Sequence, residues 1–362
     1  MTLAGVAGCT ALLVTAFGLG DSIGSVARLQ FGDIVAYDAH VHTRELSYDC
    51  QAELSVLAIR PAHATAPDNT ALFIRTMTAD AHTTTGGFSA TVIVPEDMQR
   101  LSYFVNLVTP SFGFLGRVGE TIPPPQDGVL VTEKLAREMG IAAGDSFTIT
   151  LGDGWSYTVL ATGIVENYLL HYIYMPPEYY ASLFERSWHP NGLLIAGDMD
   201  LQALRQHPSV LAITNTAWMR DNLTEQTDAL GIVTIVLMVM ACILALVVLF
   251  NLTEINILER MRELATIKVL GFQDTQMAMY LYRENMVVTG MGIALGLVAG
   301  VFLNSYILTT VEIDMLKFPH VIFPMSFMLA GGLSVLFALV VNLLTYRKLV
   351  AIDMVMSLKS VE

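Results

Sequence analysis

The stretch ALGIVTIVLMVMACILALVVLF, Ala229–Phe250, contains no charged side chain and decides the class of this protein. About 20 helical residues, rising 1.5 Å each, cross the ~30 Å hydrocarbon layer of a bilayer, so this segment is long enough to span it. Outward from it, three more uncharged apolar segments occur at residues 1–20, 285–308 and 321–346. The whole chain is 54% hydrophobic and only 14% charged, with a mean hydropathy of +0.55. We therefore predict a membrane protein with four transmembrane α-helices.

The segments between these spans are two short loops, one long insertion and a tail. The loop 251–284 and the tail 347–362 hold most of the lysine and arginine outside the insertion, which is typical of cytoplasmic segments. The short loop 309–320 has one lysine, Lys317, beside two acidic residues, so we expect it on the outer side. The insertion 21–228, between helices 1 and 2, then lies outside the cytoplasm too.

The insertion is acidic and contains one cysteine. It holds 24 acidic and 11 basic residues, against 9 acidic and 8 basic in the rest of the chain. An acidic surface argues against nucleic acid or anionic lipid as a partner of this domain, although ordinary solubility also produces one. Cys9 and Cys242 fall within spans, which leaves Cys50 without a partner for a disulfide inside the domain.

The insertion reads as a large α/β extracytoplasmic domain. Two apolar stretches, DIVAYDAHV (Asp33–Val41) and FSATVIV (Phe88–Val94), are predicted strands. GVLVTEKLAREMGIAAGD, which begins at residue 128, predicts a strand, a helix capped by Thr132 and a stop at Gly140. The alternating residues that follow predict a hairpin that turns at Asp153 and the glycine after it.

Two features of the insertion could bind a ligand. His40 and His42 lie two apart in a predicted strand, so both imidazoles share one face, as in some zinc sites. No further ligand at suitable spacing accompanies them, and packed or solvent-facing histidines are the alternative. The tyrosine-rich stretch Glu166–Phe184 either grips a ligand or forms a core strand and helix. Nothing in the sequence singles out a nucleophile, and no catalytic or metal site is predicted.

An amphipathic helix is predicted in the cytoplasmic loop, at NILERMRELATIKVLG, Asn256–Gly271. At 100° per residue its apolar side chains fill one arc and its charged side chains the opposite arc. Gly271 ends the helix, and Asp274 is placed to cap the next. Two interpretations remain open: a helix resting on lipid headgroups, or one whose charged arc meets a cytoplasmic protein.

This segment resembles a known family. NLTEINILERMRELATIKVLGF is similar to the cytoplasmic segment of FtsX-like permeases, the MacB and LolC/LolE type of ABC transporter membrane subunit. The matching positions are Glu259, Arg260, Arg262, Glu263, Lys268 and Gly271. Glu284, the tail KLVAIDMVMSLKSVE and parts of the insertion extend the resemblance over the whole chain. It implies a MacB-like core domain outside the membrane, and the chain resembles the C-terminal half of longer Gram-positive members.

The resemblance implies partners. In this family the segment is a coupling helix that docks on an ABC ATP-binding subunit. None of the five lysines of this chain follows a glycine, so the chain has no Walker A loop and ATP is expected on the partner subunit. The chain itself then needs no cofactor and is not an enzyme. A second permease copy or an upstream half is a further expected partner, beside the lipid bilayer.

The third span carries glycines at four-residue spacing, Gly292, Gly296 and Gly300. Such a stripe lets another helix approach closely, although glycine is also common in membrane helices generally. The predicted spans contain no Asp, Glu, Lys or Arg that would mark an ion path, which argues against a channel or a proton-coupled carrier.

Together these features predict a multi-pass protein of the cell membrane. The favoured function is a permease subunit that transmits ATP-driven motion to the outer domain, and so exports or extracts a lipid, peptide or antibiotic. The alternative is a mechanotransmitting regulator of a cell-wall hydrolase, or a sensor of envelope stress.

Overall fold

The computed structural model describes residues 2–58, 71–83, 86–110, 119–197, 201–260, 263 and 274–350. The chain divides into two compact units. The first, the helical unit, comprises Met1–Ile23, Ala229–Val311 and His320–Glu362. The second, the outer unit, comprises Gly24–Asp228 and Glu312–Pro319.

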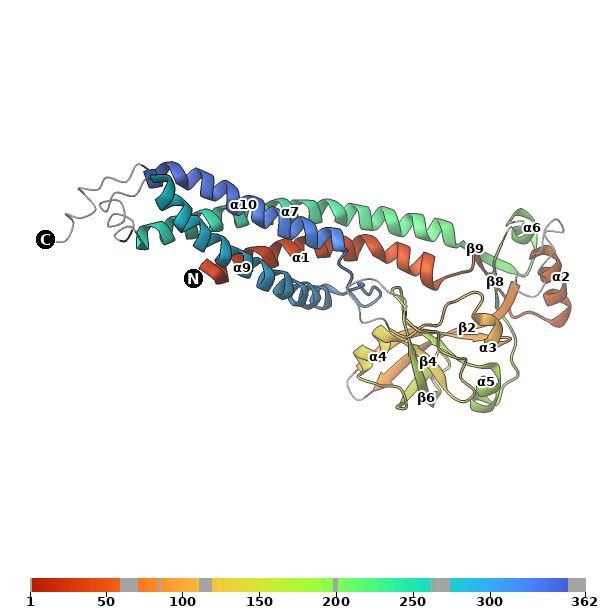
Figure 1. The fold of residues 1–362 in the computed structure, drawn as a ribbon. Coiled ribbons are helices and arrows are strands. Elements are labelled where there is room, and N and C mark those ends of the chain that lie inside the picture. The colour runs from red at the N-terminus through yellow and green to blue at the C-terminus, as the bar shows by residue number, and fades with distance from the viewer. Residues whose placement is uncertain are drawn as a thin grey trace. The chain divides into compact units, whose positions relative to one another are not determined.

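Four long helices supply the helical unit: α1 (Thr2–Arg28), α7 (Thr216–Glu259), α9 (Asp274–Val311) and α10 (Pro324–Val350) (Figure 1). Each contains an apolar stretch long enough to cross a membrane. A helix suits lipid because it satisfies every backbone N–H and C=O within the chain. The predicted four-helix architecture, with a sheet-rich domain between helices 1 and 2, is confirmed.

Two of these helices are longer than the predicted spans. α1 passes residue 20 and continues to Arg28, followed by a π-helical segment η1 (Leu29–Ile34). α7 begins at Thr216, well before residue 229, and its 44 residues extend about 66 Å at 1.5 Å each. Hydropathy locates only the part of a helix that lies in lipid, whereas the backbone pattern continues through the polar residues beyond it.

The glycine stripe of α9 lies against α1. A Cβ added at Gly296 would lie 2.6 Å from the backbone oxygen of Ala7, closer than side-chain carbons approach in proteins. The three contacts pair Gly292 with Val6, Gly296 with Ala7 and Thr10, and Gly300 with Val14. The absence of side chains at these positions lets the two backbones meet.

Polar side chains also join the helices within this unit. Thr10 on α1 donates a hydrogen bond to Ser334 on α10, with 3.0 Å between the oxygens. Asn285 on α9 donates through Nδ2 to Oδ1 of Asn342 on α10 at 3.2 Å. All four residues are buried or half-buried, so these contacts satisfy groups that lipid could not.

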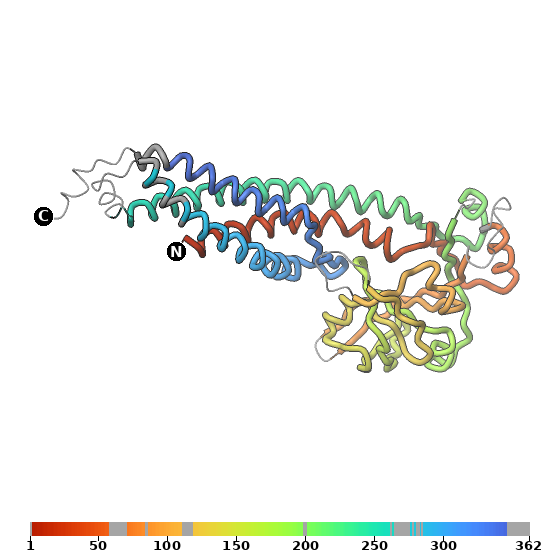
Figure 2. The backbone as a smooth tube through the Cα atoms, in the orientation of Figure 1, coloured from red at the N-terminus to blue at the C-terminus, as the bar shows by residue number. Residues whose placement is uncertain are grey.

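The outer unit is organised by a nine-stranded sheet in its described residues, in the order β3-β7-β4-β6-β5-β2-β8-β1-β9. The strands are β1 (Ala39–Thr43), β2 (Ala71–Thr83), β3 (Gly86–Pro95), β4 (Val129–Thr132), β5 (Ser146–Leu151), β6 (Ser156–Val165), β7 (Tyr172–Tyr174), β8 (Gly192–Ile195) and β9 (Val210–Asn215). β3 also pairs with β2, so the strands from β2 to β7 close into a barrel. Figure 2 shows β1, from the start of the domain, beside β8 and β9 from its end.

Two hydrophobic cores stabilise this unit. The barrel core is formed by alternate residues of the six strands together with α4 (Glu133–Met139) and α5 (Pro177–Phe184). The second core lies under β8, β1 and β9 and is completed by α2 (Tyr48–Ala58) and α6 (Leu201–Gln206). We call these three strands and two helices the edge lobe. A short helix α3 (Met98–Leu101) follows β3.

The predicted strand–helix–hairpin order is present, with one change of role. β4, α4 and the β5–β6 hairpin follow in sequence, and Gly140 adopts a left-handed φ of 67° at the end of α4. Thr132 precedes α4, but its hydroxyl makes no cap and instead accepts a hydrogen bond from the backbone N–H of Tyr172 at 3.1 Å. The side chain thus joins β4 to the neighbouring β7.

Two other sequence interpretations are settled by the fold. The strand predicted at Asp33–Val41 begins only at Ala39, because the helical path of α1 continues through η1 to Ile34. The tyrosine-rich stretch forms β7 and α5, and Tyr180 and Phe184 are buried in the barrel core. Packing therefore accounts for these aromatic residues.

Replacing Gly296 by leucine should destabilise the helical unit, because the new side chain would displace the backbone of α1. Overpacking of this kind costs about 1–3 kcal/mol. Val298→Leu is the matched control, since Val298 is 59% exposed. Thermal unfolding in detergent measures both variants, and equal melting temperatures would show that the stripe makes no helix contact.

Candidate functional site

The charged segment predicted to face the cytoplasm begins within the last turn of α7. The helix predicted to start at Asn256 does not start there: Asn256 to Glu259 are the last turn of α7, because no breaker precedes them. Glu259 and Glu263 are exposed, and Arg260 lies at a turn after the helix. Arg262, Lys268 and Gly271 lie outside the described residues.

A second candidate site, not foreseen as one, is the loop between α9 and α10. Glu312–Pro319 was predicted as part of a separate outer loop, 309–320, but α9 extends to Val311 and the loop packs within the outer unit. The backbone N–H of Leu170 donates to the carbonyl of Met315 at 2.8 Å, and the N–H of Lys317 donates to the carbonyl of Tyr168 at 2.9 Å. We call this segment, Glu312–Pro319, the α9–α10 loop.

Lys317 is the buried centre of this contact. The residue is 8% exposed, and its Nζ donates to carboxylate oxygens of Glu133 at the start of α4 and of Glu166 after β6. The ammonium also lies 5.3 Å from the centre of the Tyr168 ring. Glu166 itself is 4% exposed, so both charges are buried and each is compensated by the other.

Two further cations of α4 bind the same loop. Lys134, 3% exposed, donates to the backbone carbonyls of Ile313 and Leu316. Arg137 forms an ion pair with Glu312. Burial raises the pKa of Glu312 and lowers that of Lys134, and the nearby opposite charges counter both shifts.

The segment η1, which extends α1, also contacts this site. Gln30 in η1 donates through Nε2 to Oδ1 of Asn167 at 3.0 Å and accepts from the N–H of Tyr168 at 2.9 Å. The segment from Glu166 to Leu170 therefore contacts both the extension of α1 and the α9–α10 loop.

Sequence reasoning missed these residues because their partners are remote. Lys317 is separated from Glu133 by 184 positions and from Glu166 by 151. The available signal was a lysine in an otherwise acidic outer loop, together with a cluster of charges at the start of α4. Neither pattern identifies the other as its partner.

The histidine pair has the predicted face but a packed environment. The ring centroids of His40 and His42 are 3.9 Å apart. His42 Nε2 lies 3.2 Å from the hydroxyl of Thr214, and burial lowers the pKa of His40 to about 3, with His42 adding to the shift. Within the described part of the chain no three His, Cys, Asp or Glu side chains are grouped as metal ligands. The geometry fits neutral, packed imidazoles.

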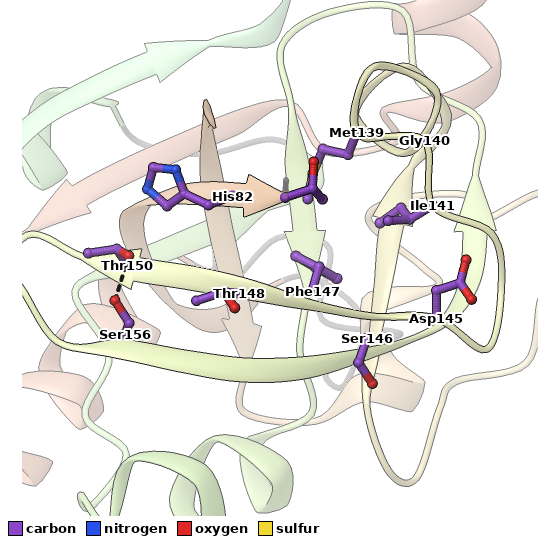
Figure 3. A pocket seen from close by; sticks show the side chains of 11 residues that line it. His82, Met139, Gly140, Ile141, Asp145, Ser146, Phe147, Thr148, Thr150 and Ser156 are labelled. Carbon is purple, nitrogen blue, oxygen red and sulfur yellow. Dashed lines mark hydrogen bonds between the residues drawn. The ribbon is translucent and has the colours of Figure 1, made fainter. Parts of the chain in front are cut away.

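An open groove of about 820 Å³ lies on the barrel beside the end of α4 (Figure 3). Its described lining is His82, Thr83, Met139, Gly140, Ile141, Asp145, Ser146, Phe147, Thr148, Thr150 and Ser156. Five of these side chains carry hydroxyls, and Thr150 and Ser156 bond each other at 2.9 Å. The lining named here includes no lysine or arginine, so the groove offers hydrogen bonds more than positive charge.

These features define a multi-pass cell-membrane protein with a large extracytoplasmic domain. Residues 235–354 match the family described as FtsX-like permease C-terminal, a range that covers most of the apolar part of α7, all of α9 and all of α10. The permease domain predicted from the cytoplasmic motif is thus present in this part of the chain. A permease domain of this family implies an ATP-binding partner.

Two solved structures resemble parts of the chain weakly. One is the periplasmic region of MacB from Actinobacillus actinomycetemcomitans, at 9% identity and a TM-score of 0.31, covering 52% of this chain and 94% of that one. The other is the extracellular domain of the noncanonic ABC-type transporter YknZ from Gram-positive bacteria, at 13% identity and a TM-score of 0.28, covering 44% and 84%. No curated protein matches the chain.

Replacing Lys317 by methionine should destabilise the outer unit. Removing one member of a buried ion pair leaves the other charge unpaired, at a cost of about 3–5 kcal/mol. The triple variant Lys317→Met, Glu133→Gln and Glu166→Gln should recover much of this loss, because no charge is stranded. Arg220→Met, at an exposed pair with Asp221, is the control and should cost at most about 1 kcal/mol. The free energy of unfolding is measured with denaturant for the parent and the three variants. A Lys317→Met variant as stable as the parent would contradict the assignment of a buried ion pair.

The outer unit should lose stability as the pH falls below about 6.5. In the unfolded chain His40 binds a proton near its ordinary pKa, whereas in the fold it stays neutral down to a pKa of about 3. Between these values the unfolded state holds more protons, which costs the fold up to about 1.4 kcal/mol per pH unit. Burial lowers the pKa of His42 and His171 as well, which adds to the slope. Unfolding measured from pH 7 to 5 should be less pH-dependent in His40→Gln than in the parent, and parallel curves would count against it.

Proposed function

We propose that this chain is the membrane subunit of an ABC transporter, driven by ATP hydrolysis on a separate ATP-binding subunit. The observation that carries the proposal is the FtsX-like permease match at residues 235–354, which includes the charged segment Glu259–Gly271. The chain has no Walker A loop. The proposed docking site of the ATPase is Glu259, Arg260, Arg262, Glu263 and Lys268, with Gly271 ending the segment.

The route from this docking site to the outer unit is continuous along the chain. α7 ends at Glu259 in the charged segment and begins at Thr216, directly after β9. The α9–α10 loop ties the other two C-terminal helices to the barrel through Lys317. These attachments support a function in which motion of the helices moves the outer unit.

The moved outer unit is proposed to export or extract an envelope substrate such as a lipid, a peptide or an antibiotic. The hydroxyl-lined groove on the barrel supports a role in contacting polar groups of such a substrate. In the alternative function, the same motion controls a cell-wall hydrolase or reports envelope stress. ATP turnover stimulated by added ligand would favour transport, and a tightly bound hydrolase would favour regulation.

Much of the apolar surface of α7 is proposed to face lipid or a second permease copy. Only 17% of its most apolar stretch is buried inside the chain, and residues such as Ile232, Ile235 and Met240 are more than half exposed. Exposed apolar surface of this extent suits a bilayer or another helix and not water.

Reversing the charges at Arg262 and Glu263 together should uncouple the ATPase while leaving membrane insertion intact. Unpaired charges in a buried interface cost about 2–5 kcal/mol, whereas a helix resting on headgroups would lose about 1 kcal/mol per charge. The variant Arg262→Glu with Glu263→Arg is coexpressed with the cognate ATPase, and pull-down and ATP turnover are measured in detergent.

The matched control exchanges an adjacent exposed pair of the outer unit, Arg220→Asp with Asp221→Arg, which should leave both readouts unchanged. Wild-type binding and turnover in the Arg262 and Glu263 variant would refute the docking site.

A further inference from the structure

β2 changes partners halfway along one of its edges. Residues Ala71 to Ile74 pair with β8 of the edge lobe, and residues Ala79 to His82 pair with β5 of the barrel. Between them, no strand of the described residues pairs with Arg75 to Thr78 on that edge, although β3 continues along the other edge up to Pro95. The sheet is therefore interrupted where the edge lobe meets the barrel.

The side chain of Asn191 fills this interruption. Its Oδ1 accepts a hydrogen bond from the backbone N–H of Thr76 at 2.7 Å, and its Nδ2 donates to the carbonyl of Thr76 at 2.8 Å. A carboxamide thus replaces the peptide group that a neighbouring strand would present. The N–H and C=O of Thr76 on this edge of β2 are thus satisfied by a side chain and not by a neighbouring strand.

Two crossings between the lobes lie within the described part of the chain, and they contact each other. One crossing is β2 at Arg75 to Thr78; the other is residues 185–191, which lead from α5 to β8. The guanidinium of Arg75 donates to the carbonyl of His189 at 2.8 Å. Trp188 packs against both cores and donates through Nε1 to the carbonyl of Val94 at 3.1 Å.

The lobes differ in how they are attached to α7, α9 and α10, while the extension of α1 reaches both of them: Gln30 in η1 bonds the barrel segment at Asn167 and Tyr168, and η1 leads into β1 of the edge lobe. The edge lobe ends in β9, which continues into α7 without a linker. The barrel holds the α9–α10 loop through Glu133, Glu166 and Arg137. Any difference in movement between α7 and the α9–α10 pair would therefore act on the two lobes separately.

We propose that the crossing at Thr76 and Asn191 is a hinge of the outer unit, and that Asn191 is the residue that sets its resting angle. The edge lobe moves with α7, and the barrel moves with the α9–α10 loop. Bending is concentrated here because the sheet has no continuous ladder between β8 and β5, and side-chain hydrogen bonds re-form more readily than strand pairs. The claim that ATP drives the bending rests on the proposed function, whereas the existence of the hinge does not.

The first test uses the full chain alone in lipid nanodiscs. Spin labels are placed at Tyr48 in the edge lobe and Ser156 in the barrel, both exposed, after replacement of Cys9, Cys50 and Cys242 by serine. Asn191→Ala should broaden the distribution of distances between the labels. It should also raise hydrogen exchange at the Thr76 amide about fivefold, the effect of losing one hydrogen bond.

The control is Asn222→Ala, an exposed asparagine of α7 that is bonded only by the side chain of Gln226 in the hydrogen bonds described. Equal label distances in the two variants, both folded by thermal unfolding, would overturn the hinge. If Asn191→Ala does not fold, Asn191→Ser takes its place, and unchanged distances in that variant overturn the hinge equally.

The second test separates the hinge from the proposed function. The labelled permease is bound to its ATPase, and label distances are compared without nucleotide and with a non-hydrolysed ATP analogue. A shift between the two states supports the driven hinge, and an active complex with identical distances in both states overturns it. Failure to bind any ATPase refutes the proposed function, and leaves the hinge to be decided by the nanodisc measurement.

Discussion

A buried ammonium group, that of Lys317, holds the outer unit to the loop between α9 and α10. The buried cation is compensated because Glu133 and Glu166 face it, and Lys134 binds the backbone carbonyls of the same loop. In such a setting attraction between the charges is offset by the loss of water, so the pairing contributes position more than stability. The position matters here because the loop is the covalent link between two membrane helices.

Specific contacts between remote parts of the chain also occur elsewhere in the molecule. Gln30 ties the extension of α1 to the segment that Lys317 also contacts. Within the helical unit, α1 is the most buried of the four helices, with half of its apolar stretch covered. Its contacts with the glycines of α9 and with Ser334 of α10 hold these three helices together. α7 continues directly from β9 of the edge lobe.

The groove on the barrel and the hinge between the lobes belong to the same unit but rest on different physics. The groove lies on the outside of a closed barrel, and hydroxyl side chains form part of its lining. The hinge is an interruption in hydrogen bonding that a single carboxamide repairs. The groove and the hinge thus serve two separate parts of the proposals made above, the groove as a contact for polar groups of a substrate and the hinge as the point at which the outer unit bends.

The sequence by itself determined the four spans, their separation by a large α/β domain, and the resemblance to FtsX-like permeases. Each is a local property: an uncharged run such as Ala229–Phe250 must leave water wherever it lies, and Gly140 can end a helix on its own. Helix ends outside the apolar spans, such as the start of α7 at Thr216, were not predictable, because hydropathy identifies only the apolar part of a helix. The tertiary structure alone decided that Lys317 pairs with Glu166, that β3 pairs with β7 in the barrel, and that Asn191 completes the edge of β2. These contacts join residues up to 151 positions apart, and no local pattern selects one remote partner over another until the chain has packed.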